Sequence, residues 1–206
     1  MIKAVIFDYG NVISVPQTGD YTREMEKRSG VPASVFKTVY DEERFDFDRG
    51  VINGATMYSR LLTQHGYYTQ AADLRLLHRL ARLDMQSWRP YNKEVSDWGL
   101  SLQKQGFKLG ILSNMPIEFL DNYKTEIPLF TAADYACFSC NEHLIKPEPA
   151  IYRKVLEGLE VHPDEAVFFD DIQENIDAAV QIGIHGFLWK SLDQGRKDWQ
   201  AAIELG

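Results

Sequence analysis

The feature that most constrains the fold is a series of short, mostly apolar runs separated by stretches with helical periodicity. Runs this short and this apolar are typical of strands that are buried on both faces, as in a parallel sheet covered by helices. We expect strands within five runs: Ala4–Phe7, Phe107–Leu112, Tyr135–Phe138, Ala166–Phe169 and Ile184–Trp189.

Helical patterns occupy the segments between these runs. Val95, Trp98 and Leu102 follow a three-to-four spacing, and comparable patterns follow Pro149 and Asp171. The order of strand, helix and strand predicts an α/β fold, with a doubly wound, Rossmann-like, parallel five-stranded sheet.

One long stretch, residues 15–88, interrupts this alternation and contains no convincing strand run. It carries helical patterns instead, over residues 21–29, 33–42, 55–65 and 71–84, with glycine or proline between them. We therefore expect two domains. An α/β core would comprise residues 1–14 and 89–206, and an inserted helical cap would comprise residues 15–88.

The charge balance narrows the range of partners. The chain has 206 residues and a formal net charge of −8, and its Lys and Arg residues form no long run. An acidic chain of this kind disfavours nucleic acid and anionic membrane as partners. No stretch is long and apolar enough to span a bilayer, and no signal-peptide pattern is seen, so we expect a cytoplasmic protein. Both a monomer and a homodimer remain open.

The two cysteines, Cys137 and Cys140, have a C-x-x-C spacing. A zinc site would need a second pair, and a redox site would need the motif at the start of a helix after a strand. The pair lies within a predicted strand region instead, so we expect a structural role.

Polar residues follow the predicted strands at the point where each strand ends. Asp8 follows the first, Ser113 and Asn114 follow the second, and Asp170 and Asp171 follow the fourth. In an open α/β sheet, ligands bind outside the carboxyl ends of the strands. We expect these side chains to meet in one crevice, together with Lys146 from the loop after the third run.

This set of side chains suits phosphoryl transfer. Asp8 is a candidate nucleophile, because aspartyl phosphates are established covalent intermediates. Asp171, with Asp8 and Asp170, offers hard oxygen ligands for Mg²⁺. Ser113 is a candidate donor to phosphoryl oxygens. Asn114 is a second candidate donor, and Lys146 supplies positive charge to the nucleophile and the transferred group.

Four segments resemble the motifs of the haloacid dehalogenase-like hydrolases, in order and in spacing. They are Phe7-Asp8-Tyr9-Gly10-Asn11-Val12-Ile13, Ile111-Leu112-Ser113-Asn114, Ile145-Lys146-Pro147-Glu148 and the run from Phe168 to Asn175. The helical insertion resembles the cap of that superfamily's helical-cap (C1) branch. The branch with bacterial alpha-glucose-1-phosphate phosphatase and the N-terminal phosphatase domain of epoxide hydrolases is the most similar.

The resemblance implies a role for each residue. Asp8 would be the nucleophile and a metal ligand, the carbonyl oxygen of Gly10 a second ligand, and Asp171 a third, with Asp170 beside it. Ser113, Asn114 and Lys146 would hold the phosphoryl group. Asn11 and Asn175 would support these groups without contacting the metal; Asn175 lies one helical turn after Asp171. The implied activity is a Mg²⁺-dependent phosphatase acting on a small phosphorylated metabolite.

The sequence departs from the superfamily pattern at Gly10. Most phosphatases of this superfamily have an aspartate there, which protonates the leaving group and then activates water. A positioned acid or base typically contributes about 10²–10⁴-fold. We therefore expect a slow enzyme, or a substrate with a good leaving group such as a sugar 1-phosphate, or an acid supplied by the cap. In the cap, Arg44, Phe45, Phe47 and Tyr58 are candidates for cap core or substrate contacts.

Two alternatives compete with the phosphatase. A 2-haloacid dehalogenase would also use Asp8 as nucleophile but would need no metal, and the acid pair Asp170 and Asp171 disfavours it. A catalytically weak phosphoryl-binding protein is the second, and Gly10 is its best support. A sugar-phosphate phosphotransferase ranks below both, since it needs the missing acid.

Overall fold

The structure, a computed structural model, describes residues 1–205. Within that range it contains a sheet of five strands in the order β3-β2-β1-β4-β5, and all neighbouring strands pair in parallel. The strands are β1 (Ala4–Phe7), β2 (Lys108–Ser113), β3 (Tyr135–Phe138), β4 (Ala166–Asp170) and β5 (His185–Leu188). The predicted doubly wound parallel sheet is confirmed, and each strand lies within one residue of its predicted run.

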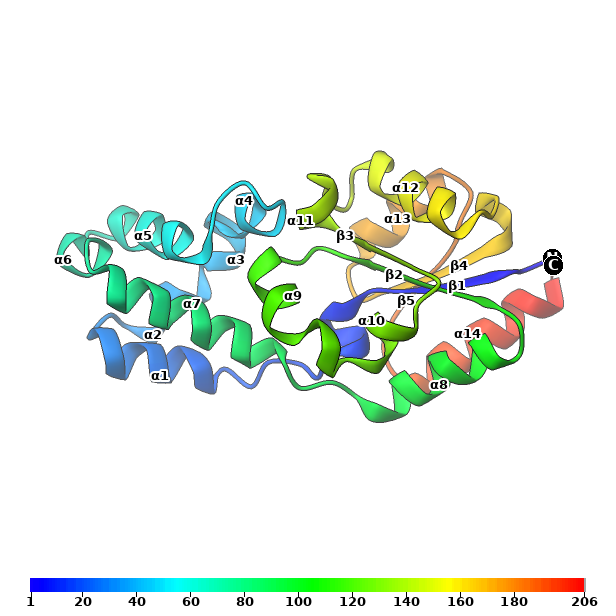
Figure 1. Ribbon diagram of the computed structural model, residues 1–206, viewed down its shortest axis with the longest axis horizontal. Helices are drawn as coiled ribbons and strands as arrows, with labels where there is room; N and C mark the ends of the chain where they lie inside the picture. Colours follow the sequence, from blue (N-terminus) through cyan, green and yellow to red (C-terminus); the bar gives the residue numbers. More distant parts are fainter. Residues whose placement is uncertain (206) are drawn as a thin grey trace.

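Helices cover both faces of this sheet, as Figure 1 shows. In β1, Ala4 and Ile6 belong to the apolar cluster formed with α12 (Pro149–Leu159) and α13 (Gln173–Gln181). Val5 and Phe7 belong to the cluster on the opposite face, which includes residues of α8 (Lys93–Lys104) and α14 (Leu192–Leu205). Successive side chains of a strand point to opposite faces. Since all four residues of β1 are buried, neither face of the central strand reaches water.

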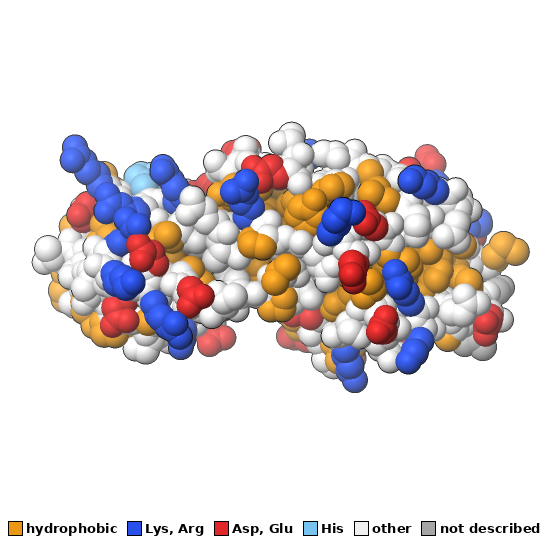
Figure 2. All heavy atoms as spheres, turned by 90° about the horizontal axis from the view of Figure 1, so that it is seen from below, with side chains coloured by type: hydrophobic (Ala, Val, Ile, Leu, Met, Phe, Trp, Pro, Cys, Tyr) orange, Lys and Arg blue, Asp and Glu red, His pale blue; other side chains and the backbone are white. Residues whose placement is uncertain are grey.

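The helical insertion follows β1 and lies at the carboxyl end of the sheet, away from both chain termini (Figure 1). Its helices are α1 (Asp20–Ser29), α2 (Ala33–Lys37), α3 (Val39–Glu42), α4 (Arg44–Asp48), α5 (Gly54–Gln64), α6 (Tyr68–Ala71) and α7 (Leu74–Trp88). The side view in Figure 2 shows two lobes joined at a narrower waist, with basic and acidic side chains interspersed on that face.

Several short helices differ from the sequence prediction. The pattern over residues 33–42 forms two helices that part at Thr38, and no helix was predicted over α4 or over the first three residues of α6. The predicted helix over 71–84 begins later, because the side chain of Asp73 accepts hydrogen bonds from the amides of Arg75 and Leu76 and caps α7. In the core, α9 (Ile117–Tyr123), α10 (Pro128–Ala132) and α11 (Ser139–Glu142) were also not predicted. Helices of one or two turns leave too little periodicity to detect.

The two chain crossings between core and insertion run side by side. Ser14 and Tyr91 form an antiparallel bridge. The amide of Val15 donates to the carbonyl of Pro90 at 2.9 Å, and the amide of Asn92 donates to the carbonyl of Ile13 at 2.8 Å. The predicted domain boundaries lie at these crossings, and a two-domain division with a mobile cap remains a prediction.

Among residues 1–205, no helix is both long and apolar enough to cross a bilayer.

Candidate active site

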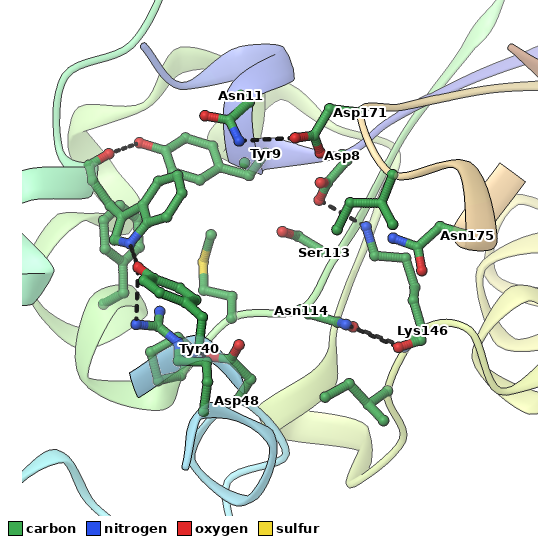
Figure 3. Close-up of a pocket in the computed structure, with 18 of the residues that line it drawn as sticks. Asp8, Tyr9, Asn11, Tyr40, Asp48, Ser113, Asn114, Lys146, Asp171 and Asn175 are labelled. Carbon is green, nitrogen blue, oxygen red and sulfur yellow. Dashed lines mark hydrogen bonds and ion pairs between the residues drawn. The ribbon is translucent and has the colours of Figure 1, made fainter. Parts of the chain in front are cut away.

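A pocket of about 380 Å³ opens at the carboxyl ends of β1, β2 and β4, between the sheet and the helical insertion. Asp8 directly follows β1, Ser113 ends β2 and Asp170 ends β4. Lys146 reaches the same place from the loop between α11 and α12. Figure 3 shows Asp8, Ser113, Lys146 and Asp171 gathered on one side of this pocket.

Lys146 bridges two buried carboxylates. Its Nζ lies 2.9 Å from Asp8 Oδ1 and 2.5 Å from Asp170 Oδ2, and its side chain is only 1% exposed. Asp8, Asp170 and Asp171 each offer a carboxylate oxygen within 4.8 Å of the others. Three acids therefore converge around one ammonium group, which leaves an excess of negative charge.

This crowding perturbs the titration of the site. Burial raises the pKa of Asp8 to about 7; Lys146 opposes this shift, and Asp170 adds to it. Burial alone would lower the pKa of Lys146, but the neighbouring Asp170 and Asp8 hold it above its usual value. Burial also raises the pKa of Asp171, against the hydrogen bond from Asn11. Asp8 and Asp171 would ionise more readily if another positive charge were present.

The donor set fits a divalent metal ion, because hard carboxylate oxygens are the ligands that Mg²⁺ prefers. The three acids differ in how many of their oxygens remain available. Asp170 Oδ2 accepts from Lys146, Asp170 Oδ1 accepts from the amide of Ile172 at 2.8 Å, and the Asn175 Nδ2 donates to both oxygens at 3.0 Å. Asp171 receives one side-chain hydrogen bond among the described residues, from Asn11 at 2.8 Å. Asp8 and Asp171 are thus better placed to bind a metal than Asp170.

The two asparagines named as supporting residues contact different acids. Asn11 has a left-handed backbone, with φ of 53°, and its Nδ2 donates to Asp171. Asn175 was expected to lie near Asp171, one helical turn away. Its amide nitrogen donates instead to the fully buried Asp170, because the side chain at the start of α13 turns toward the sheet.

Asn114 and Ser113 differ in their freedom to bind a ligand. The side chain of Asn114 accepts from the Lys146 amide at 2.8 Å and donates to the Lys146 carbonyl at 3.1 Å. It therefore ties the loop of Lys146 to the end of β2. The hydroxyl of Ser113 points into the pocket, between Asp8 and Asn114 (Figure 3).

Gly10 leaves open space beside the nucleophile candidate. Its φ and ψ of −59° and 124° are accessible to any residue. A Cβ atom at this position would lie 3.6 Å from Asp8 Oδ2 and 3.8 Å from the ring of Trp88, which are ordinary contacts. The backbone would therefore accept a longer side chain, although the Trp88 ring limits its direction.

The insertion supplies the other side of the pocket, and sequence reasoning did not single out most of these residues. Tyr40, Arg44, Phe45, Asp48 and Trp88 all line it. Of the cap candidates named from the sequence, Arg44 and the half-exposed Phe45 line the pocket. The other two, Phe47 and Tyr58, are buried in the apolar core. No periodic signal marks Asp48, because it lies on a one-turn helix, and the helical pattern over residues 33–42 does not distinguish Tyr40 from its neighbours.

Arg44 is the centre of a buried charge cluster in the insertion. Its Nε donates to Asp48 Oδ1 and its NH1 donates to Asp84 Oδ2, both at 2.7 Å. NH1 also contacts the hydroxyl of Tyr40 at 3.3 Å, and this hydroxyl accepts from the indole of Trp88 at 2.6 Å. Burial raises the pKa of Asp48 and of Asp84, and Arg44 opposes both shifts.

Cys137 lies in β3 as predicted, but Cys140 lies on the one-turn helix α11, not in the strand region predicted for the pair. Both cysteines are buried and unpaired among the described residues. Burial raises the pKa of the Cys137 thiol to about 12 and that of the Cys140 thiol to about 11. Thiols that hold their protons so strongly are weak nucleophiles. These environments agree with the structural role expected from the sequence.

Comparison with known proteins gives one family. Residues 2–183 match the haloacid dehalogenase-like hydrolases. The chain is 40% identical over 191 residues to acyl-CoA dehydrogenase family member 10 of Mus musculus, covering 89% of this chain and 17% of that protein. It is 24% identical over 199 residues to bifunctional epoxide hydrolase 2 of the same species, covering 89% of this chain and 35% of that protein. The chain thus spans about a third or less of these relatives.

Solved structures share the fold. A HAD family enzyme from Bacteroides thetaiotaomicron, in complex with magnesium and inorganic phosphate, is similar with a TM-score of 0.69 at 17% identity. That match covers 93% of this chain and 96% of the other. The L-2-haloacid dehalogenase PA0810 is similar with a TM-score of 0.68 at 17% identity, covering 91% and 84% of the two chains. Both phosphate-binding and dehalogenating proteins therefore share this architecture.

Proposed function

The chain belongs to the haloacid dehalogenase-like hydrolases, and on that premise we propose that it is a Mg²⁺-dependent phosphatase acting on a small phosphorylated metabolite. The observation that carries the proposal is the cluster of Asp8, Asp171 and Lys146 at the floor of a pocket that the helical insertion covers. The magnesium and phosphate bound by the Bacteroides relative support the same chemistry.

In this proposal, Asp8 attacks phosphorus and the bond to the leaving oxygen breaks, giving a phosphoryl-aspartate that water then hydrolyses. Lys146 lies 2.9 Å from Asp8 Oδ1, so its ammonium favours the ionised nucleophile. The Ser113 hydroxyl and Lys146 bind the phosphoryl oxygens. Asn114 acts on the same group indirectly, because its amide holds the main chain of Lys146.

Asp8, Asp171 and the carbonyl oxygen of Gly10 would hold Mg²⁺. Asp170 would hold Lys146 in place, since its oxygens already accept hydrogen bonds from protein donors. Asn11 would orient Asp171, and Asn175 would orient Asp170. When bound, the cation supplies positive charge that favours the ionised acids and offsets the charge of the phosphoryl group.

We propose a sugar phosphate, with the phosphate on the anomeric oxygen, as the substrate class. With glycine at position 10, the first motif lacks the carboxyl group that would protonate a leaving group, and an anomeric oxygen leaves more readily than an ordinary alkoxide. The pocket supports this choice, because Tyr9, Tyr40 and Trp88 offer aromatic faces and Arg44 offers hydrogen-bond donors for hydroxyls.

A metal-independent 2-haloacid dehalogenase is the second candidate, favoured by the missing acid at Gly10 and by the shared fold of the PA0810 dehalogenase. The acid cluster weighs against it. Without a cation, Asp171 beside Asp8 would repel a carboxylate-bearing substrate. Activity on 2-haloacids that persists in excess EDTA would favour the dehalogenase and contradict the phosphatase.

The deciding experiment is a screen of phosphorylated metabolites with Mg²⁺, repeated in EDTA and with Asp8→Asn. We expect hydrolysis of at least one sugar phosphate, loss of activity in EDTA, and a loss of about 10⁴-fold or more in the variant. Asp20→Asn, at an exposed position of α1, is the matched control and should keep full activity. Equal rates on alkyl and anomeric phosphates would contradict the choice of leaving group.

A further inference from the structure

The enzyme has to protonate its leaving group, and glycine at position 10 cannot do so. Within residues 1–205, the pocket contains one further carboxyl group that belongs to the insertion, that of Asp48 on α4. We propose that Asp48 is the general acid and base of the reaction, supplied from the cap. This inference rests on the proposed phosphatase function and adds a catalytic residue to it.

Asp48 lies across the pocket from Asp8 and Asp171, and its side chain points into the cavity (Figure 3). It is close enough to Lys146, which contacts Asp8 at 2.9 Å, for the ammonium charge to act on its pKa. A group that departs from a phosphorus atom held between Ser113 and Lys146 would extend toward this side of the pocket.

Contacts with the core hold Asp48 in place over the site. Its carbonyl accepts from the Ser139 hydroxyl at 2.5 Å, and Ser139 Oγ accepts from the Met115 amide at 2.8 Å. Met115 lies two residues beyond Ser113, so these contacts join Asp48 to the phosphate-binding loop. Gly50, two residues after Asp48, also packs closely against the core, because a Cβ atom on it would lie 2.8 Å from the carbonyl oxygen of Cys140.

The charge balance around Arg44 favours a protonated acid. Asp48 and Asp84 share one guanidinium, that of Arg44, and all three side chains are at most 11% exposed. With both acids ionised, the cluster would carry a net negative charge out of contact with bulk water. Such a charge is costly, which favours retention of a proton by one of the two acids.

The contacts of the two acids assign that proton to Asp48. Asp84 is fully buried; its Oδ2 accepts from Arg44 and its Oδ1 lies 3.5 Å from the Tyr40 hydroxyl. Asp48 Oδ1 accepts from Arg44, while Oδ2 has no hydrogen-bond partner among the described residues. A protonated Oδ2 can therefore donate into the pocket. The charged and titratable groups of the surrounding elements are Arg44, Asp84, Tyr40, Tyr58, Cys140 and Lys146.

The proposed steps conserve protons and charge. As Asp8 bonds to phosphorus, the bond between phosphorus and the leaving oxygen breaks, and its electron pair stays on that oxygen. The Asp48 proton passes to the same oxygen, so the product leaves as a neutral alcohol and Asp48 becomes a carboxylate. That carboxylate then takes a proton from water as the water attacks phosphorus. The bond to Asp8 breaks, inorganic phosphate forms, and Asp48 is protonated again.

Asp48→Asn tests the proposal, because the amide can still accept from Arg44 but cannot transfer a proton. We expect a loss of about 10²–10⁴-fold on glycerol phosphate, whose leaving group is poor. With p-nitrophenyl phosphate, phosphorylation should slow by less than about tenfold, and the phosphorylated enzyme should accumulate as a burst. Asp46→Asn, an exposed acid on the same helix, is the matched control and should change neither rate. Equal slowing on both substrates, without a burst, would overturn the proposal.

Asp84→Asn separates proton transfer from a structural effect of breaking the cluster. It removes the competing acid, so Arg44 pairs with Asp48 alone and Asp48 ionises more readily. The rate on glycerol phosphate should then decline at a lower pH than in the wild type, while in Asp48→Asn the decline should be absent. If Asp84→Asn instead matches Asp48→Asn on both substrates at every pH, the role of Asp48 is structural.

A direct titration keeps this inference distinct from the proposed function. In protein labelled with ¹³C at aspartate carboxyl carbons, one resonance missing from Asp48→Asn should titrate well above the range of an exposed aspartate, because burial raises the pKa of Asp48. If that carboxyl titrates in the ordinary range of an exposed aspartate, the general-acid proposal fails even in an active phosphatase. If the carboxyl is protonated but no phosphate ester is hydrolysed, the proposed function fails instead.

Discussion

At the scale of single residues, the site is governed by the cost of burying charge. Asp8, Asp170 and Lys146 are all less than 10% exposed, and Lys146 contacts both carboxylates. Together with Asp171, the acids outnumber the nearby cations, so the cluster is unfavourable by itself. Such an unfavourable cluster of charge is typical of a site that binds a cation and a phosphoryl group.

In the metal-free protein, the ionisation of Asp8 should make the free energy of unfolding depend on pH. Its folded pKa of about 7 is above the usual 3.8, so its contribution to stability is present below pH 4 and is lost as pH rises through about 7. Asp8→Asn removes this dependence. We compare the free energy of unfolding of the variant with that of the wild type, in urea without metal. The variant minus wild-type difference should be larger at pH 8 than at pH 5 by on the order of 3 kcal/mol. An equal difference at both pH values would contradict the assignment.

Asn175 is the support of Asp170. Its buried Nδ2 donates to both carboxylate oxygens at 3.0 Å. Asn175→Ala leaves these oxygens without that donor, so it should lower the free energy of unfolding by about 1–3 kcal/mol. The rate of phosphate-ester hydrolysis should fall at least tenfold. Gln173→Ala removes an exposed side chain of the same helix, which pairs with Asp177, and should change neither quantity. Urea unfolding and steady-state rates provide the test, and equal effects of the two variants would refute it.

At the scale of elements, the corner that follows α4 joins the insertion to the core. Arg49 forms an ion pair with Glu148, which follows Lys146 and Pro147, and its NH1 donates to the carbonyl of His143 at 3.1 Å. Glu148 Oε2 also accepts from the amide of Ile145 at 3.2 Å. The same loop thus carries the lysine of the site and the docking point for the insertion.

Breaking the ion pair between Arg49 and Glu148 should weaken the docking of the insertion on the core more than it lowers the free energy of unfolding. We expect Glu148→Gln to raise the KM for p-nitrophenyl phosphate by about three- to tenfold, because the closed arrangement becomes less populated. The free energy of unfolding should change by less than about 1 kcal/mol, since the pair is partly exposed. Arg60→Ala breaks an ion pair with Asp46 inside the insertion and serves as the control. An unchanged KM in Glu148→Gln would show that the pair does not control closure.

At the scale of the whole molecule, two lobes share one pocket and are joined by two crossings. The crossings lie side by side at Ser14 and Tyr91, and the hydroxyl of Tyr9 donates to the carbonyl of Trp88 at 2.6 Å. A paired connection of this kind permits rotation about one axis while limiting other motions. We therefore propose that residues 15–88 move as a body over residues 1–14 and 89–206.

Filling the site should favour closure. With Mg²⁺ and BeF₃⁻ bound at Asp8, hydrogen exchange should slow at residues 49–52 and in the loop around Lys146, because these segments meet only when the lobes are docked. Exchange in α6, at the far end of the insertion in Figure 1, is the internal control. Equal protection throughout the insertion would indicate general stabilisation rather than docking.

Local patterns in the sequence were enough to predict the sheet and the position of the site. Every strand was found from its apolar run. In β1 and β4, at the centre of the sheet, all residues are buried, so both faces leave a signal in neighbouring residues. Asp8, Ser113 and Asp170 could be placed together because parallel strands end at one edge of a sheet. The longer helices α1, α5 and α7 were detectable by their periodicity, with ends displaced by a few residues.

Only the tertiary structure decided which partner each polar group has. Asn175 donates to Asp170 rather than Asp171, and the side-chain amide of Asn114 bonds to the main chain of Lys146. Asp48 reaches the pocket from a one-turn helix. These contacts depend on the angle at which α13 leaves the sheet and on the docking of the insertion. Such angles are set by packing between residues far apart in the chain, and no periodicity within one segment records them.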